Sequence, residues 1–219
     1  MDRLQELQGL FWQSTWETLY IVAITLFLGG LGGLLLGVGL YVTRGGGILA
    51  NRYVSIVLNL FVNFFRPIPF IIFIAAVQPA ARVVVGIGIG NKAIIFALVL
   101  AASFGISRIV EQNLVSVPPG VLEAARSMGA GRLRTIVTVL IPEALGPLIL
   151  GYSFAFVAIV DMSAVAGVIG GGGLGTFAQV YGYRQFDPTV TWAAVLMIVI
   201  IVQAGQFAGN ALARKALRR

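Results

Sequence analysis

Five long apolar runs, separated by short polar or glycine-rich segments, limit the fold of this chain more than any other feature. A helix needs about 17–25 predominantly apolar residues to cross a bilayer. With 58% hydrophobic and 11% charged residues in 219, the chain is too apolar for a soluble domain. The sequence therefore predicts an all-α integral membrane protein with five transmembrane helices. We expect these spans over about 15–42, 53–77, 93–110, a stretch that ends near 168, and 189–212.

The chain contains no histidine and no cysteine, which removes the usual ligands of zinc, haem and iron–sulfur sites and the Ser-His triad. Only Lys92 and Lys215 could act as amine bases, so a membrane enzyme is a poorly supported hypothesis. The net charge of +7 is spread beside the apolar runs and forms no single basic stripe. We therefore expect no metal, no cofactor and no nucleic-acid partner for this chain, with membrane lipid around it.

Five spans place the two termini on opposite sides of the membrane, and the positive-inside rule chooses the orientation. We expect residues 1–13 outside, a five-span domain over 14–212 with a cytoplasmic loop over about 113–142, and a basic cytoplasmic tail over 213–219. With the C-terminus in the cytoplasm, four basic residues lie outside: Arg3, Arg82, Lys92 and Arg184. Ten then lie in the cytoplasm: Arg44, Arg52, Arg108, Arg126, Arg132, Arg134, Arg214, Lys215, Arg218 and Arg219.

Glycines recur every four residues along the first predicted span, at Gly29, Gly33 and Gly37, with Gly32 beside them. Small residues at this spacing let a second helix approach closely, and in lipid it is packing that drives helix association. The alternative is that membrane helices simply tolerate glycine. The pattern predicts one glycine-lined face against a neighbouring helix.

The second predicted span contains polar groups, Asn59, Asn63 and Arg66, and two prolines, Pro67 and Pro69. An arginine near the middle of a membrane is costly unless it faces a polar partner or a wet cavity. The prolines also leave backbone carbonyls that need partners. We expect a functional or assembly role, with snorkelling to the interface as the alternative. A glycine-containing loop is expected over 78–92.

The fourth predicted span carries Asp161, followed by Met162 and Ser163, and we take these three as further candidates for a pathway lining. Arg66 and Asp161 are expected about 20 Å and 26 Å along their helices, at similar depth. We therefore expect them to be energetically linked, directly or through water, with a solvated Asp161 as the alternative. The glycines at 170–173 follow a membrane helix and not a strand, so we interpret them as a flexible turn.

The segment 117–142 is a polar island in this apolar chain. Pro118 and Pro119 end the preceding helix, and Gly129 favours a helix C-terminus, which predicts a short helix over about 120–128. Such a helix is marginal alone in water and must dock on another element. The face expected to dock holds Val121, Leu122, Ala125 and Met128.

This island resembles the EAA loop of the membrane permeases of ATP-driven importers. The resemblance is carried by Glu123, Ala124 and Ala125, then Gly129, and finally Val139, Ile141 and Pro142. In that family the short helix is a coupling helix, which fits a cleft on a cytoplasmic ATPase and transmits its motion. The resemblance implies coupling residues Glu123, Ala124, Ala125, Arg126, Gly129 and Pro142. An ordinary amphipathic loop helix is the alternative.

Motifs along nearly the whole chain are similar to those of the methionine-importer permeases. They lie at 16–19, 40–44, 65–72, 141–145, 171–175, 181–183 and 206–209. The resemblance implies a type I importer permease fold in a bacterial inner membrane, and a homodimer that forms the pathway for methionine, L or D or both. It also implies two cytoplasmic ATPase subunits that bind ATP and Mg²⁺, and an extracytoplasmic substrate-binding lipoprotein.

Two departures from that family bear on the substrate. Pro67 stands where the family usually has Ser, and Asp161-Met162 stands where it usually has Gly-Tyr. An importer for another small amino acid or similar solute is therefore the alternative. A stand-alone channel or secondary transporter predicts inverted repeats, which an odd number of spans with one cytoplasmic island fits poorly.

Overall fold

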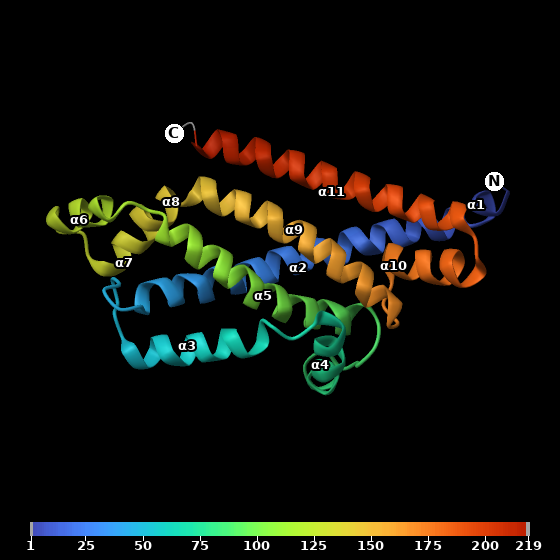
Figure 1. Cartoon of the computed structure of the whole chain (residues 1–219), viewed down its shortest axis with the longest axis horizontal. Coiled ribbons are helices and arrows are strands. Elements are labelled where there is room, and N and C mark those ends of the chain that lie inside the picture. Colours follow the sequence, from blue (N-terminus) through green and yellow to red (C-terminus); the bar gives the residue numbers. More distant parts are fainter. Residues whose placement is uncertain (1, 218–219) are drawn as a thin grey trace.

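The structure, a computed structural model, describes residues 2–217, and this part of the chain is helical with no β-strand. Four long helices run along the long axis of the molecule (Figure 1), and each is long and apolar enough to cross a membrane. A fifth span is made by two helices, α3 and α4, with a sharp bend between them. The all-α, five-span prediction is confirmed. The long helices are α2 (Gln8–Thr43), α5 (Asn91–Val115), α9 (Leu145–Val168) and α11 (Pro188–Leu217).

The glycine face of α2 packs against α5, as the four-residue spacing predicts. A methyl group added at Gly29 would overlap Ala102, one at Gly33 would overlap Ile106, and one at Gly37 would overlap the backbone and side chains around Ser107 and Val110. The Ser103 hydroxyl also donates to the Gly29 carbonyl across this interface, at 3.3 Å. The glycines therefore serve close packing between α2 and α5.

The second predicted span is not one helix. α3 (Arg52–Phe65) and α4 (Phe70–Val85) meet at an angle of 112°, with residues 66–69 between them. Pro67 and Pro69 cannot donate backbone hydrogen bonds, and Pro69 takes an extended ψ of 133° as the N-cap of α4. The loop predicted over 78–92 is also wrong over its first half, because α4 continues to Val85 and only 86–90 connects it to α5.

Aromatic packing holds this bend against α5. The ring of Phe65, at the end of α3, stacks on Phe104 of α5 with centroids 4.9 Å apart. Phe73 of α4 and Phe61 of α3 meet the same Phe104 ring edge-on. One phenylalanine of α5 thus contacts both halves of the broken span, which fixes their relative direction.

The predicted glycine turn after α9 is present at 170–172, but it is held by hydrogen bonds to other helices and is shorter than predicted, because α10 (Gly173–Phe177) begins at Gly173. Helix α10 leads into the π-helix η2 (Ala178–Gly182) and the 3₁₀ turn η3 (Tyr183–Gln185). Glycines on both sides permit close approach, because a methyl group at Gly167 of α9 or at Gly175 of α10 would overlap the backbone of the other helix. We name residues 170–187 the return segment, since the chain turns back here before α11 (Figure 1).

Side chains from two distant helices clamp the start of the return segment. The Glu17 carboxylate of α2 accepts the Gly173 N–H at 2.8 Å, and the Thr18 hydroxyl accepts the Leu174 N–H at 2.8 Å. The Asn91 side chain of α5 accepts the Gly172 N–H at 2.9 Å. Three backbone donors that α10 cannot satisfy internally therefore have fixed partners.

The two ends of the chain lie at opposite ends of the molecule (Figure 1). The N-terminal side, with α1 (Asp2–Glu6), lies beside the return segment, and the C-terminal end of α11 lies toward α6 (Pro119–Ser127). The first long helix begins at Gln8, inside the predicted outer segment 1–13, and α11 extends to Leu217, inside the predicted tail. Arg218 and Arg219 of that tail lie outside the described residues.

Candidate functional site

The polar island forms a compact group of short helices at one end of the molecule (Figure 1), which we call the α6 end. It contains α6 and three shorter elements that lead into α9. These are α7 (Arg132–Thr135), the π-helix η1 (Ile136–Leu140) and α8 (Ile141–Glu143).

The residues that bound α6 explain why so short a helix forms. Pro118 is extended at ψ 131°, and Pro119 occupies the first turn, where a missing N–H has no cost. Gly129 takes a left-handed φ of +79°, and the next N–H, of Ala130, donates to the Ala125 carbonyl at 3.1 Å. Gly129 is therefore required by backbone conformation, and the predicted range of 120–128 agrees within one residue.

Most of α6 is exposed. Ala125 is its one buried residue, at 3% exposure, and Leu122 packs against a core cluster that includes Ile136 and Leu140. The predicted docking face is wrong at Met128, which is 81% exposed because α6 ends before it. Of the sequence-predicted coupling residues, Ala125 is buried and five are exposed: Glu123, Ala124, Arg126, Gly129 and Pro142.

A cavity of about 280 Å³ separates α6 from the turn that joins α2 to α3. Tyr41 and Arg44 line one side of it, and Leu122, Glu123 and Arg126 line the other. The Arg44 guanidinium lies over the Tyr41 ring, 4.2 Å from its centre, which holds that charge at the mouth of the cavity. Helix α6 thus contacts η1 and α7, while the cavity separates it from the turn.

Pro142 lies in α8, directly after the π-helix η1. A proline ring inside a regular α-helix clashes with the carbonyl four residues before it and removes a hydrogen bond. The wider π-turn before Pro142 relieves this conflict, and the Ala144 N–H then donates to the Leu140 carbonyl at 3.2 Å. Pro142 therefore shapes the path from the island into α9.

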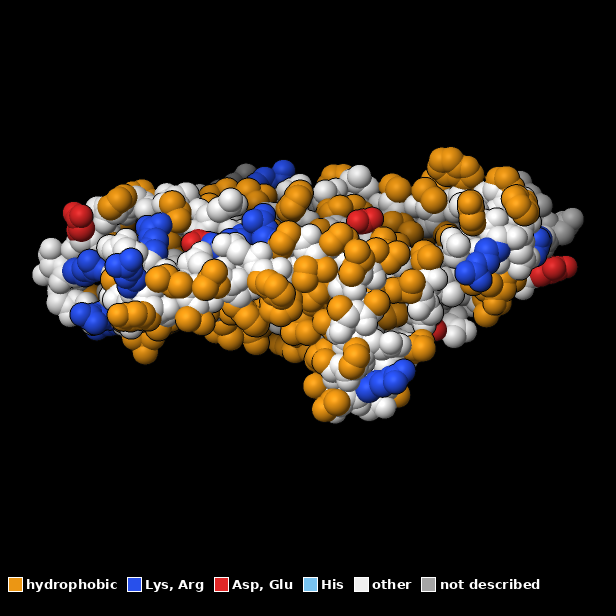
Figure 2. Space-filling model, turned by 60° about the horizontal axis from the view of Figure 1, so that its bottom comes forward, with side chains coloured by type: hydrophobic (Ala, Val, Ile, Leu, Met, Phe, Trp, Pro, Cys, Tyr) orange, Lys and Arg blue, Asp and Glu red, His pale blue; other side chains and the backbone are white. Residues whose placement is uncertain are grey.

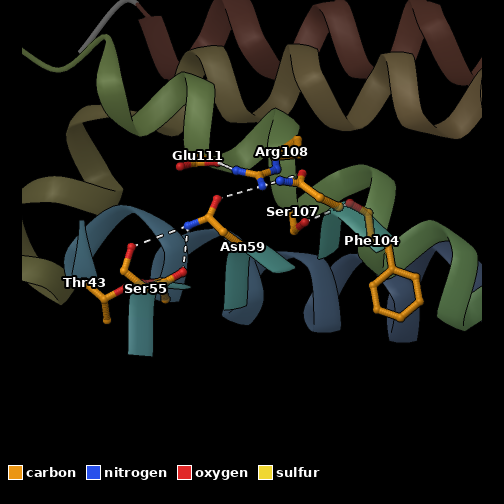
Figure 3. Close-up of polar contacts among 9 residues, drawn as sticks. Thr43, Ser55, Asn59, Phe104, Ser107, Arg108 and Glu111 are labelled. Atoms are coloured by element: carbon orange, nitrogen blue, oxygen red, sulfur yellow. Dashed lines mark hydrogen bonds and ion pairs between the residues drawn. The ribbon is translucent and has the colours of Figure 1, made fainter. Parts of the chain in front are cut away.

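The most extensive side-chain network joins α3 to α5 (Figure 3). The Arg108 guanidinium donates to the side-chain oxygens of Asn59, at 2.8 Å, and Asn63, at 2.7 Å. The other terminal nitrogen of Arg108 lies 2.5 Å from the Glu111 carboxylate. The side chains of Arg108 and Glu111 are largely buried, at 15% and 20% exposure. Asn59 in turn donates to the Ser55 carbonyl at 2.8 Å.

Sequence reasoning did not connect these residues. It took Asn59 and Asn63 as polar candidates of the second span, and it used Arg108 as one of the basic residues on the cytoplasmic side. The available signal was spacing: the asparagines are four residues apart and the charged pair three, so each pair shares a helix face. Asn59 and Asn63 bind a neighbouring helix, which gives the intramembrane asparagines the polar partners they require, and their place in a pathway stays a prediction.

Arg66 lies at the break between α3 and α4 and borders a cavity of about 300 Å³. Five phenylalanines, Ala158 and Met162 also line this cavity, so its wall is apolar apart from Arg66. Among residues 2–217 no carboxylate lies within ion-pairing distance of Arg66. We call it the Arg66 cavity.

The three candidates in α9 have different surroundings. Asp161 is exposed and makes no ion pair within the described part of the chain, so no direct bond joins it to Arg66. Met162 is half-buried and lines the Arg66 cavity. Ser163 is buried, at 5% exposure, and its hydroxyl donates to the Val160 carbonyl at 2.7 Å. This side chain therefore points toward the protein core.

Hydrophobic side chains cover the middle of the molecular surface, and Lys and Arg side chains gather at the α6 end (Figure 2). Phe154 of α9 and Phe64 of α3 belong to the apolar surface, at 70% and 69% exposure. An apolar band with a basic end is the surface expected of a protein whose α6 end projects from a membrane.

Comparison with known proteins identifies a family and close relatives in sequence. Residues 29–218 match the family described as "Binding-protein-dependent transport system inner membrane component". The chain is 40% identical over 206 residues to the "Probable D-methionine transport system permease protein MetI" of Vibrio cholerae, covering 94% of this chain and 92% of the relative. It is 39% identical over 199 residues to the "Methionine import system permease protein MetP" of Bacillus subtilis, covering 91% and 90%.

The fold of this chain also matches that of a solved structure. The chain matches one from "Inward facing conformations of the MetNI methionine ABC transporter" with a TM-score of 0.93 and 39% identity, covering 96% of this chain and 98% of that one. A chain of an "amino acid ABC transporter with histidines" matches with a TM-score of 0.79 at 21% identity, which shows the shared fold alone.

Proposed function

This chain belongs to the binding-protein-dependent transport system inner membrane components, and from that premise we propose that two copies of it form the translocation pathway of an ATP-driven methionine importer. The match to the permease chain of a solved methionine transporter over 96% of this chain carries the proposal. The chain is a transport subunit, so ATP and Mg²⁺ belong to an ATPase partner.

The α6 end is the proposed contact with that ATPase. Helix α6 buries little more than Ala125, yet it presents Glu123, Ala124 and Arg126 to solvent. Leu122 connects it to the core cluster that continues through Leu140 into Leu148 of α9. Movement of α6 by an ATPase therefore reaches α9 through packed side chains, and not through the loop alone.

The proposed pathway follows the side of α9 that carries Asp161 and borders the Arg66 cavity. In this chain alone, Asp161 and Arg66 are exposed in the middle of an apolar surface, where contact with lipid would be costly. A second copy facing this side encloses both groups and any water around them. The pathway then lies between two copies, with Met162 in its wall.

The orientation in this proposal has the α6 end in the cytoplasm and the return segment outside. The substrate-binding protein then delivers its ligand at the return segment, and two ATPase subunits bind the two copies of α6. Arginines at the α6 end, including Arg126, Arg132 and Arg134, favour the cytoplasmic side.

A transport assay tests the substrate and the subunit composition. The permease is co-expressed with its ATPase and reconstituted into proteoliposomes with the binding protein. We expect ATP-dependent uptake of radiolabelled methionine, competed by unlabelled L- or D-methionine, and a native mass that contains two permease copies. ATP-dependent uptake that methionine does not inhibit would contradict the substrate, and a complex with one permease copy would contradict the shared pathway.

One residue favours a second candidate substrate. Asp161 places a carboxylate on the pathway side of α9, where it can attract the ammonium group of an amino acid. An importer of another small amino acid, especially one with a second cationic group, would use such a carboxylate. Competition by lysine and ornithine in the same uptake assay separates this candidate from methionine.

A further inference from the structure

A long apolar groove lies on the opposite side of α9 from the proposed pathway. It has a volume of about 780 Å³, within the range of roughly 300–1,000 Å³ that ligand pockets occupy. Its walls come from α2, α9 and α11, with Ile141 of α8 at one end. Helices α2 and α11 both pack against α9 but make few contacts with each other, and the groove is the space left between them.

The groove offers almost no polar group to a ligand along its length. Small residues, among them Gly30, Ala23 and Ala208, make it wide, and Leu26, Leu34 and Leu148 form apolar walls. Two hydroxyls border it, but Tyr152 donates to the Gly30 carbonyl at 2.6 Å and Ser153 donates to the Ile149 carbonyl at 2.9 Å, so both are satisfied. An occupant must therefore be long and apolar, and water is a poor one.

The groove faces away from the surface that needs a protein partner. At about 100° per residue, Phe154, Ala158 and Asp161 share one side of α9, and Ile149, Tyr152 and Phe156 lie opposite. The exposed ionisable group is thus on the first side, where a second copy is required. The opposite side, which lines the groove, has no such requirement, and the bilayer supplies its natural occupant.

One basic residue marks the mouth of the groove at the α6 end. Leu145 and Leu212 line this part of the groove. Lys215 follows Leu212 by three residues and Ala208 by seven, so it lies on the same face of α11 about one turn beyond the apolar wall. Lys215 is exposed there, beyond the apolar wall, as a cation that binds a lipid phosphate must be.

We propose that this groove is a specific phospholipid site, which holds one acyl chain between α2 and α11 and places the phosphate beside Lys215. The lipid fills the gap that the two helices leave over α9. The bound lipid is therefore part of the folded permease, unlike the bulk lipid of the bilayer.

Photo-crosslinking tests the site on the permease assembled with its ATPase. The complex is reconstituted in nanodiscs with phosphatidylglycerol that carries a diazirine in one acyl chain, and the labelled peptides are identified by mass spectrometry. We expect labels on the α2, α9 and α11 segments that line the groove. Ala208→Trp fills the groove from an exposed position, and we expect it to lower this labelling about tenfold.

Two further variants make the result specific. Ala204→Trp places the same side chain on the same helix, at an exposed position that does not line the groove, and should leave labelling unchanged. Lys215→Ala should lower it about fivefold through loss of the phosphate contact. Equal labelling in Ala208→Trp and wild type would overturn the proposal. Dissociation of the dimer of Ala208→Trp on native mass measurement, with labelling unchanged, would also overturn it, because the groove would then be the contact site of a second copy.

Discussion

The two ends of this molecule are held in different ways. At the return segment, the side chains of Glu17, Thr18 and Asn91 bind three backbone N–H groups from across the fold. At the α6 end, a helix of nine residues buries one alanine fully and leaves most of its surface to solvent. The first end satisfies these backbone donors within one chain, whereas the second leaves most of a helix uncovered, and we propose that the ATPase covers it. In this proposal the first end is the rigid one and the second couples the two proteins.

The largest effect is expected at the α6 end. Gly129→Asp puts a side chain into a left-handed conformation, at a cost of roughly 1 kcal/mol, and adds a negative charge at the C-terminal end of α6, where it is unfavourable. This misplaces the C-terminus of α6, and we expect methionine uptake to fall about tenfold or more while the subunit still inserts. Glu123→Lys should act similarly by reversing an exposed charge.

Gly131→Ala is the matched control for Gly129→Asp. Gly131 has an ordinary φ of −66° and open space where a Cβ would lie, so this variant should transport normally. Uptake and membrane content are measured together. Wild-type uptake by Gly129→Asp would remove α6 from the coupling mechanism.

The next largest effect is expected between the two ends, at the link between α3 and α5. Arg108→Ala removes bonds to Asn59 and Asn63 and leaves Glu111 largely buried without its partner. Hydrogen bonds to charged groups contribute about 1.5–3 kcal/mol, so we expect destabilisation of about 2 kcal/mol. Thermal unfolding in detergent measures it.

Arg108→Lys should recover only part of this stability, because an ammonium cannot reproduce the fork that reaches both helices. Arg126→Ala, on the exposed surface of α6, serves as the control and should leave the unfolding temperature unchanged. Equal unfolding temperatures for Arg108→Ala and the control would show that the network does not hold α3.

A smaller and more local effect is expected at the return segment. Glu17→Ala leaves the Gly173 N–H without its acceptor, at a cost of about 1–2 kcal/mol. Amide hydrogen exchange over residues 172–185 should accelerate, with little change at α6. Glu17→Gln keeps an acceptor oxygen and should exchange more slowly than Glu17→Ala, and Glu6→Ala is the exposed control. Slow exchange in Glu17→Ala would mean that the clamp is not what holds this end.

The spans could be predicted from the sequence because hydrophobicity is local, and the glycines of α2 because their spacing is regular. The break at 66–69 was signalled by Pro67 and Pro69, but the residues on both sides are apolar and together have the length of one span, so the sequence did not separate one kinked helix from two helices. The return segment was misjudged for a different reason. Glycine permits mobility, but the acceptors that fix Gly172 and Gly173 lie 81 and 156 residues away in the chain.

The candidate site was predictable where a motif is continuous. Residues 123–129 are adjacent in sequence, and α6 forms there. The partners of Asn59 and Asn63 were not predictable, because which helix faces α3 is set by tertiary packing. Arg66 and Asp161 were expected to meet, yet no bond joins them within one chain, and their linkage stays a prediction.

The smallest effect is expected for that linkage. If the two charges interact through water or across two copies, the double variant Asp161→Ala/Arg66→Ala should lose less transport than the sum of the single variants, by at least about 0.5 kcal/mol. Uptake rates of the four proteins give the coupling energy. Strict additivity would leave Asp161 as a solvated residue of the pathway.

Side-specific labelling tests most directly whether the α6 end is the cytoplasmic, ATPase-binding end. The chain has no native cysteine, so Gly131→Cys and Gln185→Cys each provide one reactive thiol. An impermeant maleimide should label Gly131→Cys only from the cytoplasmic side, more slowly once the ATPase is bound, and Gln185→Cys only from outside. Labelling of Gln185→Cys from the cytoplasm, or equal labelling of Gly131→Cys with and without the ATPase, would contradict the assignment of the two ends.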